Sequence, residues 1–566
     1  MSHFTWLSCF IGLWSSVYLV DAALRTHPYT RQWYQEFTTR LGISFDILQA
    51  RFFTQRLNRV FQFICHLNFV PWTTWFSCGV IFSTVFMVLS IWLLALLAYN
   101  TLMRKSIEGQ ILTPVMPGVN LPFSQMGFYM LTLLLCALLH EAGHALAALH
   151  ERVRLHGFGV FLFGFYPGAY VDLNTADLQG LAPFNQLRIY CAGVWHNAVI
   201  AIFSVLLFYT MPYLLSPGYH TGSGVGVTYL RENSVVTGHR GLSLGDAITR
   251  INSCPVANQS DWYRCLEEAH ARPSGYCVSG AYLNTIHTTY EAQGPRRTLS
   301  AVASVGRSAD SGETGYTGTP GDSQSTFDCC SHQSASTHLC FTYSVLSKHG
   351  GKSPRYACLP ARPVTERATC YSAADCGPQS VLRQGNSAKS GLAESGLLSA
   401  ASRNVICVVP SPPDNQTRLV RLVHNRKEAP AILFLGPLDD LLSSVGVSDY
   451  VPRWPSILSP NFPVVLGLFC TYLFSLSGAL VILNVVPCYA LDGQWILKAL
   501  IDWCLSGCLP CRWRRQVLFK VVMFIGSLLL CTNVFLALWY FILEADFGST
   551  HSALHSTAVP VGAGIS

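Results

Sequence analysis

Two histidines four residues apart, with a glutamate directly after the first, are the residues of this chain whose types and spacing best fit metal chemistry. They lie in the segment His140-Glu141-Ala142-Gly143-His144. On an α-helix, residues i and i+4 lie above one another on one face, so both imidazoles can bind the same tetrahedral zinc ion. Glu141 can reach a water molecule on that metal. The pattern is typical of zinc hydrolases.

The surroundings of this motif are apolar. Glu141 is the only Asp, Glu, Lys or Arg residue between Glu108 and Glu151. An ionisable side chain in hydrocarbon costs free energy unless it binds a partner or faces a polar cavity. The motif therefore predicts a water-splitting metal site at membrane depth. The alternatives are a chance match on a soluble helix and a purely structural metal site.

The composition is that of a membrane protein. Half of the 566 residues are hydrophobic and only 12% are charged, and the mean hydropathy is +0.33, so the chain is too apolar for an ordinary soluble protein. About six uncharged runs are long enough to cross a bilayer as helices. They cover residues 4–20, 73–100, 122–150, 189–215, 461–487 and 521–543. We interpret the first as a retained helix, because no basic residue precedes it and no clear cleavage site follows.

A shorter apolar run at residues 157–171 contains Gly157, Gly159, Gly164 and Pro167. Its length and glycines favour a re-entrant hairpin or sheet in the membrane over a spanning helix, and protein must then bury its backbone.

A polar segment, residues 217–452, interrupts the apolar runs. Its crowded, even set of cysteines predicts disulfides and therefore an oxidising lumen. Zinc ribbons are the alternative, but no paired C-x-x-C spacing supports them. Two sequons, at Asn258 and Asn415, agree with a lumenal, glycosylated segment. The ten cysteines are Cys254, Cys265, Cys277, Cys329, Cys330, Cys340, Cys358, Cys370, Cys376 and Cys407.

Part of this segment is similar to a PDZ domain. The run that begins GVGVTYL at Gly224 contains short β-like stretches around a Gly-rich turn at residues 241–246, and it resembles the first half of that fold. The runs 417–425 and 429–437 are expected to supply its later strands, so the cysteine-rich part would be an insertion. Residues 287–326 and 377–403 have few large apolar side chains, and we expect them to be disordered loops.

A catalytic zinc ion usually has three protein ligands and one open position. Between Arg453 and Lys498 the only charged residue is Asp492, which follows the helix breaker Pro487. A lone carboxylate in an apolar run is suited to complete a His, His, Asp site. The alternative is an aspartate that caps a helix at the membrane surface.

Together these motifs resemble the site-2 protease family of intramembrane zinc metalloproteases. The resemblance rests on HEAGH at residues 140–144, N-x-x-P at 484–487 followed by LDG at 491–493, and the PDZ-like insertion. Bacterial members commonly read N-P-x-P-x-L-D-G, and the departure here fits the animal branch.

The resemblance implies one zinc ion bound by His140, His144 and Asp492, with Glu141 as the catalytic glutamate. It also points to Asn197, in the segment Gly193-Val194-Trp195-His196-Asn197, as a residue that faces the active site. From this position alone we expect Asn197 to contact the substrate or its oxyanion. The neighbouring His196 is expected to pack or to form a hydrogen bond.

The implied activity is that of a metalloendopeptidase that cuts a peptide bond within a transmembrane helix. In the animal family the substrates are membrane-anchored transcription factors, such as the sterol regulatory element-binding proteins and the stress factor ATF-six, after a first lumenal cut. The resemblance thus implies single-pass substrates, the lipid bilayer as a partner, no direct nucleic acid, and a multi-pass protein of the Golgi and endoplasmic reticulum. The run at 157–171 is expected to pair with the unwound substrate.

Two other functions remain open at this point, a membrane metal transporter and a non-catalytic scaffold that bears a PDZ-like module. Three cysteines, Cys504, Cys508 and Cys511, lie beside a basic group that includes Arg512, Arg514, Arg515 and Lys520. Such a basic group is typical of the cytoplasmic end of a helix. Palmitoylation, metal binding and no special role are the three interpretations of these cysteines.

The sequence therefore predicts a polytopic α-helical membrane protein, with about six transmembrane helices and a re-entrant segment, into which a lumenal, disulfide-rich, PDZ-like α/β module is inserted. The predicted parts are a first transmembrane helix (1–24), a polar connection (25–72), a transmembrane helix (73–100), a first catalytic core (122–215), the lumenal module (217–452), a second catalytic core (453–500) and a C-terminal helix with its tail (501–566).

Overall fold

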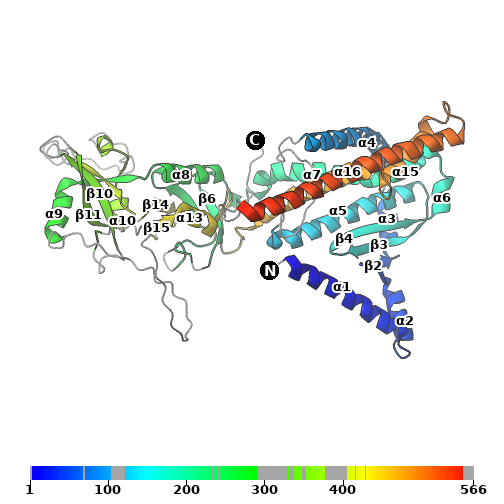
Figure 1. Cartoon of the computed structure of the whole chain (residues 1–566), viewed down its shortest axis with the longest axis horizontal. Helices are drawn as coiled ribbons and strands as arrows, with labels where there is room; N and C mark the ends of the chain where they lie inside the picture. Colours follow the sequence, from blue (N-terminus) through cyan, green and yellow to red (C-terminus); the bar gives the residue numbers. More distant parts are fainter. Residues whose placement is uncertain are drawn as a thin grey trace. The chain divides into compact units, whose positions relative to one another are not determined.

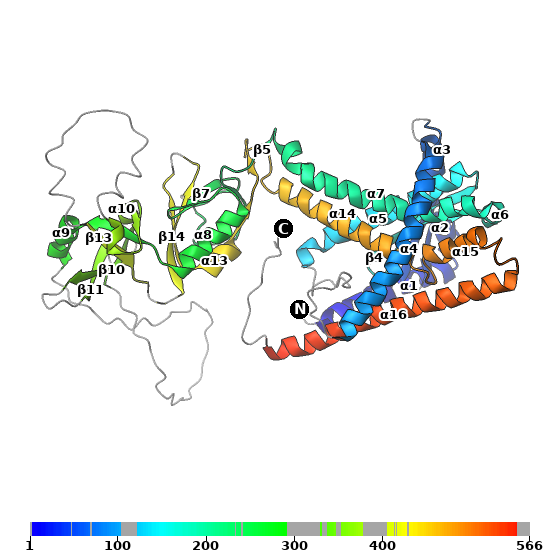
Figure 2. The ribbon, with the colours of Figure 1, turned by 90° about the horizontal axis from the view of Figure 1, so that it is seen from above.

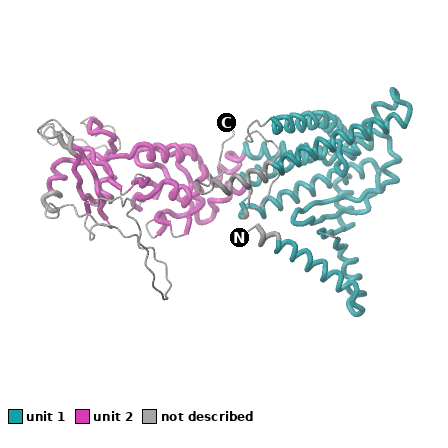
Figure 3. The backbone as a smooth tube through the Cα atoms, viewed as in Figure 1, with its two compact units in different colours: residues 1–210, 467–566 teal, residues 211–466 magenta. Residues whose placement is uncertain are grey.

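The chain forms two compact units in a computed structural model. Residues 1–210 and 467–566 make unit 1, and residues 211–466 make unit 2 (Figure 3). The structure describes residues 3–46, 48–67, 71–103, 122–232, 234–238, 241–290, 329–330, 337–346, 352–376, 405–412, 414, 416–426 and 429–551.

Unit 1 is built mainly of long helices (Figure 1). Its elements are α1 (His3–Thr26), α2 (Arg31–Leu41), β1 (Ile43–Asp46), β2 (Gln49–Thr54), α3 (Leu57–Cys65), α4 (Trp72–Leu102), α5 (Phe123–His150), β3 (Leu155–Phe163), β4 (Tyr166–Leu173), α6 (Thr175–Gly180), α7 (Pro183–Leu215), α14 (Phe462–Val485), α15 (Asp492–Cys504) and α16 (Arg512–His551).

Five helices of the described residues are long and apolar enough to cross a membrane, namely α4, α5, α7, α14 and α16. They match five of the six predicted runs. The first run does form a helix, α1, but it is not among these five, so its crossing of the membrane stays a prediction. Asp21, near the end of α1, is buried and pairs with Arg25 and with the hydroxyl of Tyr34.

The run at 157–171 forms the antiparallel hairpin of β3 and β4, and it extends slightly beyond both predicted ends. These strands belong to a sheet of order β1-β2-β3-β4. The other two strands come from the segment predicted as a mere polar connection, because β2 pairs with β3 from Gln49↔Phe163 to Thr54↔Phe158. The sheet therefore has β4 as one edge, and β4 packs along α5.

The helices of unit 1 share an apolar core. Val80 of α4, Leu187 of α7, Val485 of α14, Ile496 of α15 and Met523 of α16 are buried in one cluster. A second cluster joins α5 to the sheet, where Ala145 and Phe158 are buried together. Figure 2 shows α7 and α14 along one another and α15 beside the start of α16. This packing places residues that are far apart in the sequence next to each other.

The described residues of unit 2 form two larger sheets and a two-stranded sheet of β5 and β17. Its elements are β5 (Tyr219–His220), β6 (Val225–Leu230), β7 (Ala247–Ile251), β8 (Cys254–Pro255), α8 (Gln259–Ala271), β9 (Gly275–Ser279), α9 (Gly280–Tyr290), β10 (His338–Leu346), β11 (Lys352–Pro360), α10 (Ala361–Thr365), β12 (Thr369–Cys370), η2 (Ala373–Cys376), β13 (Val405–Pro410), β14 (Thr417–His424), β15 (Ile432–Pro437), α13 (Leu438–Ser444), β16 (Val445–Ser448) and β17 (Val451–Pro452).

The first sheet has the order β15-β14-β7-β6-β16, with β8 paired to β7. It includes β6 and β7, from the run that begins at Gly224, and β14 and β15, from the runs 417–425 and 429–437. β14 joins the two parts because it pairs with both β7 and β15. Trp262 of α8 is fully buried against this sheet. Between α8 and β14 in the sequence lies the second sheet, of order β11-β10-β13-β9-β12.

The two predicted loops fall mostly outside the described residues, over 291–326 and 377–403. Residues 287–290 are an exception, because α9 continues to Tyr290. The loop bounds are approximate, and the loops themselves stay a prediction.

All ten cysteines of unit 2 are joined in disulfides, as predicted. The pairs are Cys254–Cys265, Cys277–Cys376, Cys329–Cys340, Cys330–Cys358 and Cys370–Cys407. The eleven cysteines of unit 1 are all free thiols. The two units thus differ completely in their cysteine chemistry.

Candidate metal centre

His140, His144 and Asp492 meet in unit 1 although the aspartate is distant in the sequence. His140 Nε2 lies 2.9 Å from Asp492 Oδ2 and 3.2 Å from His144 Nε2. His144 Nε2 lies 3.3 Å from the same carboxylate oxygen. Both histidines are almost fully buried. The three groups predicted as ligands therefore converge on one point.

The spacing of these three atoms fits a zinc ion. Zinc bonds to nitrogen and oxygen are about 2.0–2.1 Å long, so at tetrahedral angles the ligand atoms are about 3.3 Å apart. The observed separations of 2.9–3.3 Å are close to this value. Two neutral imidazoles and one carboxylate are also a donor set that zinc prefers.

The second nitrogen of each histidine contacts α7. His144 Nδ1 lies 2.7 Å from the carbonyl oxygen of Ile189. A carbonyl can only accept, so Nδ1 carries the proton and Nε2 keeps its lone pair for a metal. His140 Nδ1 lies 3.0 Å from the side-chain amide of Asn197. One helix thus orients both imidazoles.

The hydrogen bonding of the Asn197 amide also supports a metal at this site. Its side chain is fully buried, and its Oδ1 has no hydrogen-bond partner among the described residues. The two ends of an amide are assigned from the surrounding network. Turning the amide over brings Oδ1 to His140 Nδ1, which can then donate a proton and leave Nε2 free to bind zinc. The contact points to a positioning role, and contact of Asn197 with the substrate oxyanion stays a prediction.

Gly193 makes room for the site. A Cβ atom added there would collide with the Nε2 atoms of His140 and His144. Ile189, Gly193 and Asn197 are four residues apart, so they form one stripe on the face of α7 that meets the histidines. The sequence analysis missed Gly193, although its spacing from Asn197 was a signal for this shared face.

Asp492 is placed by a tight connection between two helices. α14 ends at Val485, and Asp492 is the first residue of α15. A Cβ atom at Gly493 would collide with the carbonyl oxygen of Val486, so only glycine lets α15 begin this close to α14. The Leu-Asp-Gly sequence therefore has a physical reason, and Asp492 is held at the site and does not cap a surface helix.

Glu141 is held by the sheet. Its Oε2 accepts a hydrogen bond of 3.0 Å from the backbone N–H of Val171. This N–H lies on the edge of β4 that does not pair with β3. Whether an unwound substrate also pairs with this hairpin, as expected from its sequence, stays a prediction.

His196 is not a ligand in this arrangement. Its Nδ1 lies 2.7 Å from the carbonyl oxygen of Ala192, and its ring contacts Trp75 and Phe76. The residue packs, as predicted.

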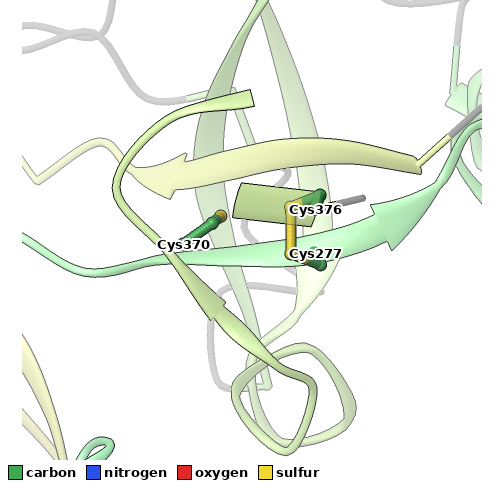
Figure 4. Close-up of side chains that lie close together, drawn as sticks. All are labelled: Cys277, Cys370 and Cys376. Carbon is green, nitrogen blue, oxygen red and sulfur yellow. A yellow bond between two sulfur atoms is a disulfide. The ribbon is translucent and has the colours of Figure 1, made fainter. Parts of the chain in front are cut away.

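A second cluster of metal-ligand types, Cys277, Cys370 and Cys376, lies in unit 2. Figure 4 shows the disulfide that joins Cys277 to Cys376, with Cys370 beside it. Cys370 is bonded to Cys407. Because these sulfurs are already in disulfides, the cluster consists of two neighbouring disulfide bonds and is not a set of free metal ligands.

One of the two predicted glycosylation sites lies among the described residues. Asn258 is exposed, and its Oδ1 caps α8 by accepting a hydrogen bond from the N–H of Asp261. Asn415 lies outside the described residues.

Comparisons with known proteins agree with this geometry. Residues 128–529 match the profile of peptidase family M50. The chain is also similar to a protein of Arabidopsis thaliana described as a membrane-bound transcription factor site-2 protease homolog. The two are 27% identical over 433 residues, which cover 75% of this chain and 80% of the relative.

Proposed function

Because the chain belongs to peptidase family M50, it is a membrane metalloprotease of the site-2 protease family, and we propose that it cuts a peptide bond within a transmembrane helix of its substrate. The observation that carries the proposal is the convergence of His140, His144 and Asp492 among helices that are apolar enough to cross a membrane. Members of this family are zinc metalloproteases, and the three side chains fit one zinc ion.

The chemistry follows from the positions of these residues. Zinc held by His140, His144 and Asp492 would supply the Lewis acidity that lowers the pKa of water and polarises a carbonyl. The carboxylate of Glu141 takes the proton from the attacking water and delivers it to the leaving amine nitrogen. The edge of β4 orients Glu141 through Val171, and α7 orients both imidazoles.

The proposed substrates are single-pass, membrane-anchored transcription factors, of the sterol regulatory element-binding and ATF-six type, that a first protease has already cut on the lumenal side. The similarity to the Arabidopsis membrane-bound transcription factor site-2 protease homolog supports this substrate class. We also propose that the protein lies in the Golgi and endoplasmic reticulum membranes, where its cut would release a cytosolic domain.

We propose that unit 2 is lumenal and that its first sheet is PDZ-like. The division of the cysteines supports the lumenal side, because disulfides persist in oxidising compartments and only unit 2 contains them. The pairing of β14 with both β7 and β15, with α8 against the same sheet, supports the PDZ-like fold.

Reconstitution tests this proposal. The purified full chain is incorporated into phospholipid vesicles with a single-pass substrate whose lumenal part is either intact or removed. We expect the trimmed form to be cleaved, and we expect a zinc chelator to stop the reaction and added zinc to restore it. Absence of cleavage of the trimmed form by zinc-loaded protein would contradict the proposal.

The positioning role of Asn197 gives a separate prediction. Asn197→Leu keeps the volume but removes the acceptor for His140, and loss of such an outer partner typically costs about 10–100-fold in metal affinity or activity. We expect zinc affinity, measured by competition with a chromogenic chelator in detergent, to fall within this range. Asn197→Asp keeps an acceptor and should restore most of the affinity.

Ser204→Ala is the matched control, since Ser204 is also fully buried on α7 but bonds only to the carbonyl of Ala201 among the described groups. This variant should bind zinc like the wild type. If Asn197→Leu also binds zinc like the wild type, Asn197 does not position His140.

A further inference from the structure

The connection between α15 and α16 gathers three thiols that the hydrolytic site does not use. Cys504 ends α15, Cys508 lies in the turn, and Cys511 directly precedes α16. All three are exposed and unoxidised. They are therefore accessible to chemistry from outside the protein.

This connection lies at a membrane surface. α16 begins at Arg512, one residue after Cys511, and its uncharged run starts at Val521. The exposed side chains of Trp503 and Trp513 flank the cysteines, and such rings favour the level of the lipid headgroups. Arg514 and Lys520 are exposed and would face the same surface. Thiols in this setting are expected near the level of the lipid headgroups.

The chain order places the connection on the face opposite to the one that α14 enters. α14 follows the residues of unit 2 and is long enough to cross. Figure 2 shows α15 and the start of α16 at the end of α14 that is remote from its beginning. If unit 2 is lumenal, as proposed above, the three thiols are cytosolic. Their free state and the basic residues beside them agree with that side.

Metal binding is the rival use of three nearby cysteines. Among described side chains whose ligand atoms gather within 4.8 Å of one another, two groups are found, and these cysteines belong to neither. A preformed metal site is therefore not present at this connection, and exposed juxtamembrane cysteines are instead typical acceptors of fatty acyl chains.

We propose that Cys504, Cys508 and Cys511 are sites of S-acylation by a long-chain acyl-coenzyme A. The cysteine sulfur attacks the thioester carbonyl, a new sulfur–acyl bond forms, and the bond between the acyl group and coenzyme A breaks. The proton of the cysteine thiol passes to the coenzyme A thiolate, so no oxidant or reductant is needed.

The modification would bear on the hydrolytic site through α15. This helix begins with Asp492 and ends with Cys504. Near its far end, Asp502 pairs with Arg515 of α16 at 3.5 Å. An acyl chain on Cys504 would fasten that end to the bilayer, and so help to hold the helix that carries the carboxylate ligand.

Acyl exchange on the full chain expressed in animal cells tests the proposal. Free thiols are blocked, thioesters are cleaved with neutral hydroxylamine, and the released thiols are labelled with a maleimide polymer that slows migration on a gel. We expect hydroxylamine-dependent shifts in the wild type, with one polymer for each acylated cysteine. The triple variant Cys504→Ser, Cys508→Ser, Cys511→Ser should show none while it retains zinc.

Cys78→Ser and Cys531→Ser are the controls, because both cysteines are exposed but lie within the spans of α4 and α16. These variants should keep the wild-type shifts. The absence of hydroxylamine-dependent label in the wild type, or label that persists in the triple variant, would overturn the proposal. Since the assay does not depend on proteolysis, Glu141→Gln should be acylated like the wild type, which separates this result from a failure of the proposed function.

Discussion

Replacing Glu141 with glutamine is expected to abolish peptide cleavage and to leave zinc content unchanged. The amide keeps the size of the carboxylate but cannot take a proton from water, and a positioned general base contributes about 10²–10⁴-fold to the rate. Glu141 is not among the three converging ligand groups, so the metal should remain. Cleavage in vesicles and zinc per chain, measured on the same preparation, check both parts.

Glu36→Gln is a suitable control, because Glu36 is an exposed residue of α2 that pairs only with Arg40 among the described side chains. It should cleave like the wild type. The substitution of Glu141 also distinguishes the rival functions, since a metal transporter would keep its flux and a scaffold would keep its partners. A Glu141→Gln protein that cleaves at the wild-type rate would remove Glu141 from the mechanism.

Replacing Asp492 with asparagine is expected to lower both zinc content and cleavage. The carboxylate oxygen lies 2.9 Å and 3.3 Å from the two histidine nitrogens, and asparagine has no charge with which to complete the set. The loss of affinity should exceed the about 10–100-fold cost of losing an outer partner. Metal analysis after dialysis against a weak chelator measures it.

Asp502→Asn provides the comparison on the same helix. Asp502 pairs with Arg515 near the end of α15 and is remote in sequence from the ligand. This variant should retain one zinc per chain. Equal zinc retention in Asp492→Asn and the wild type would show that the third ligand has been assigned wrongly.

The reacting side chains could be predicted because each has a local signal. The i, i+4 spacing of His140 and His144 is a property of one helix. Asp492 stands out as the only charge in a long apolar run. Their convergence was expected from the resemblance, and the structure supplies its cause in the tight start of α15 at Gly493.

Other parts of the site had no such signal. The hydrogen bond from Val171 to Glu141 uses a backbone N–H, which every residue except proline carries. β1 and β2 are short and partly polar, and β2 is stabilised by pairing with β3 about 100 residues later in the chain. The disulfide pairs are likewise set by tertiary contacts, as in Cys277–Cys376, and many pairings are compatible with ten cysteines.

The most direct test of the central claim is the position of the bond that is cut. Mass spectrometry of the product released from a trimmed substrate by the zinc-loaded wild type in vesicles would identify its new terminus. We predict that this terminus lies within the apolar membrane-spanning segment of the substrate and that Glu141→Gln does not produce it. A terminus outside that segment, or the same product from Glu141→Gln, would contradict intramembrane hydrolysis at this metal centre.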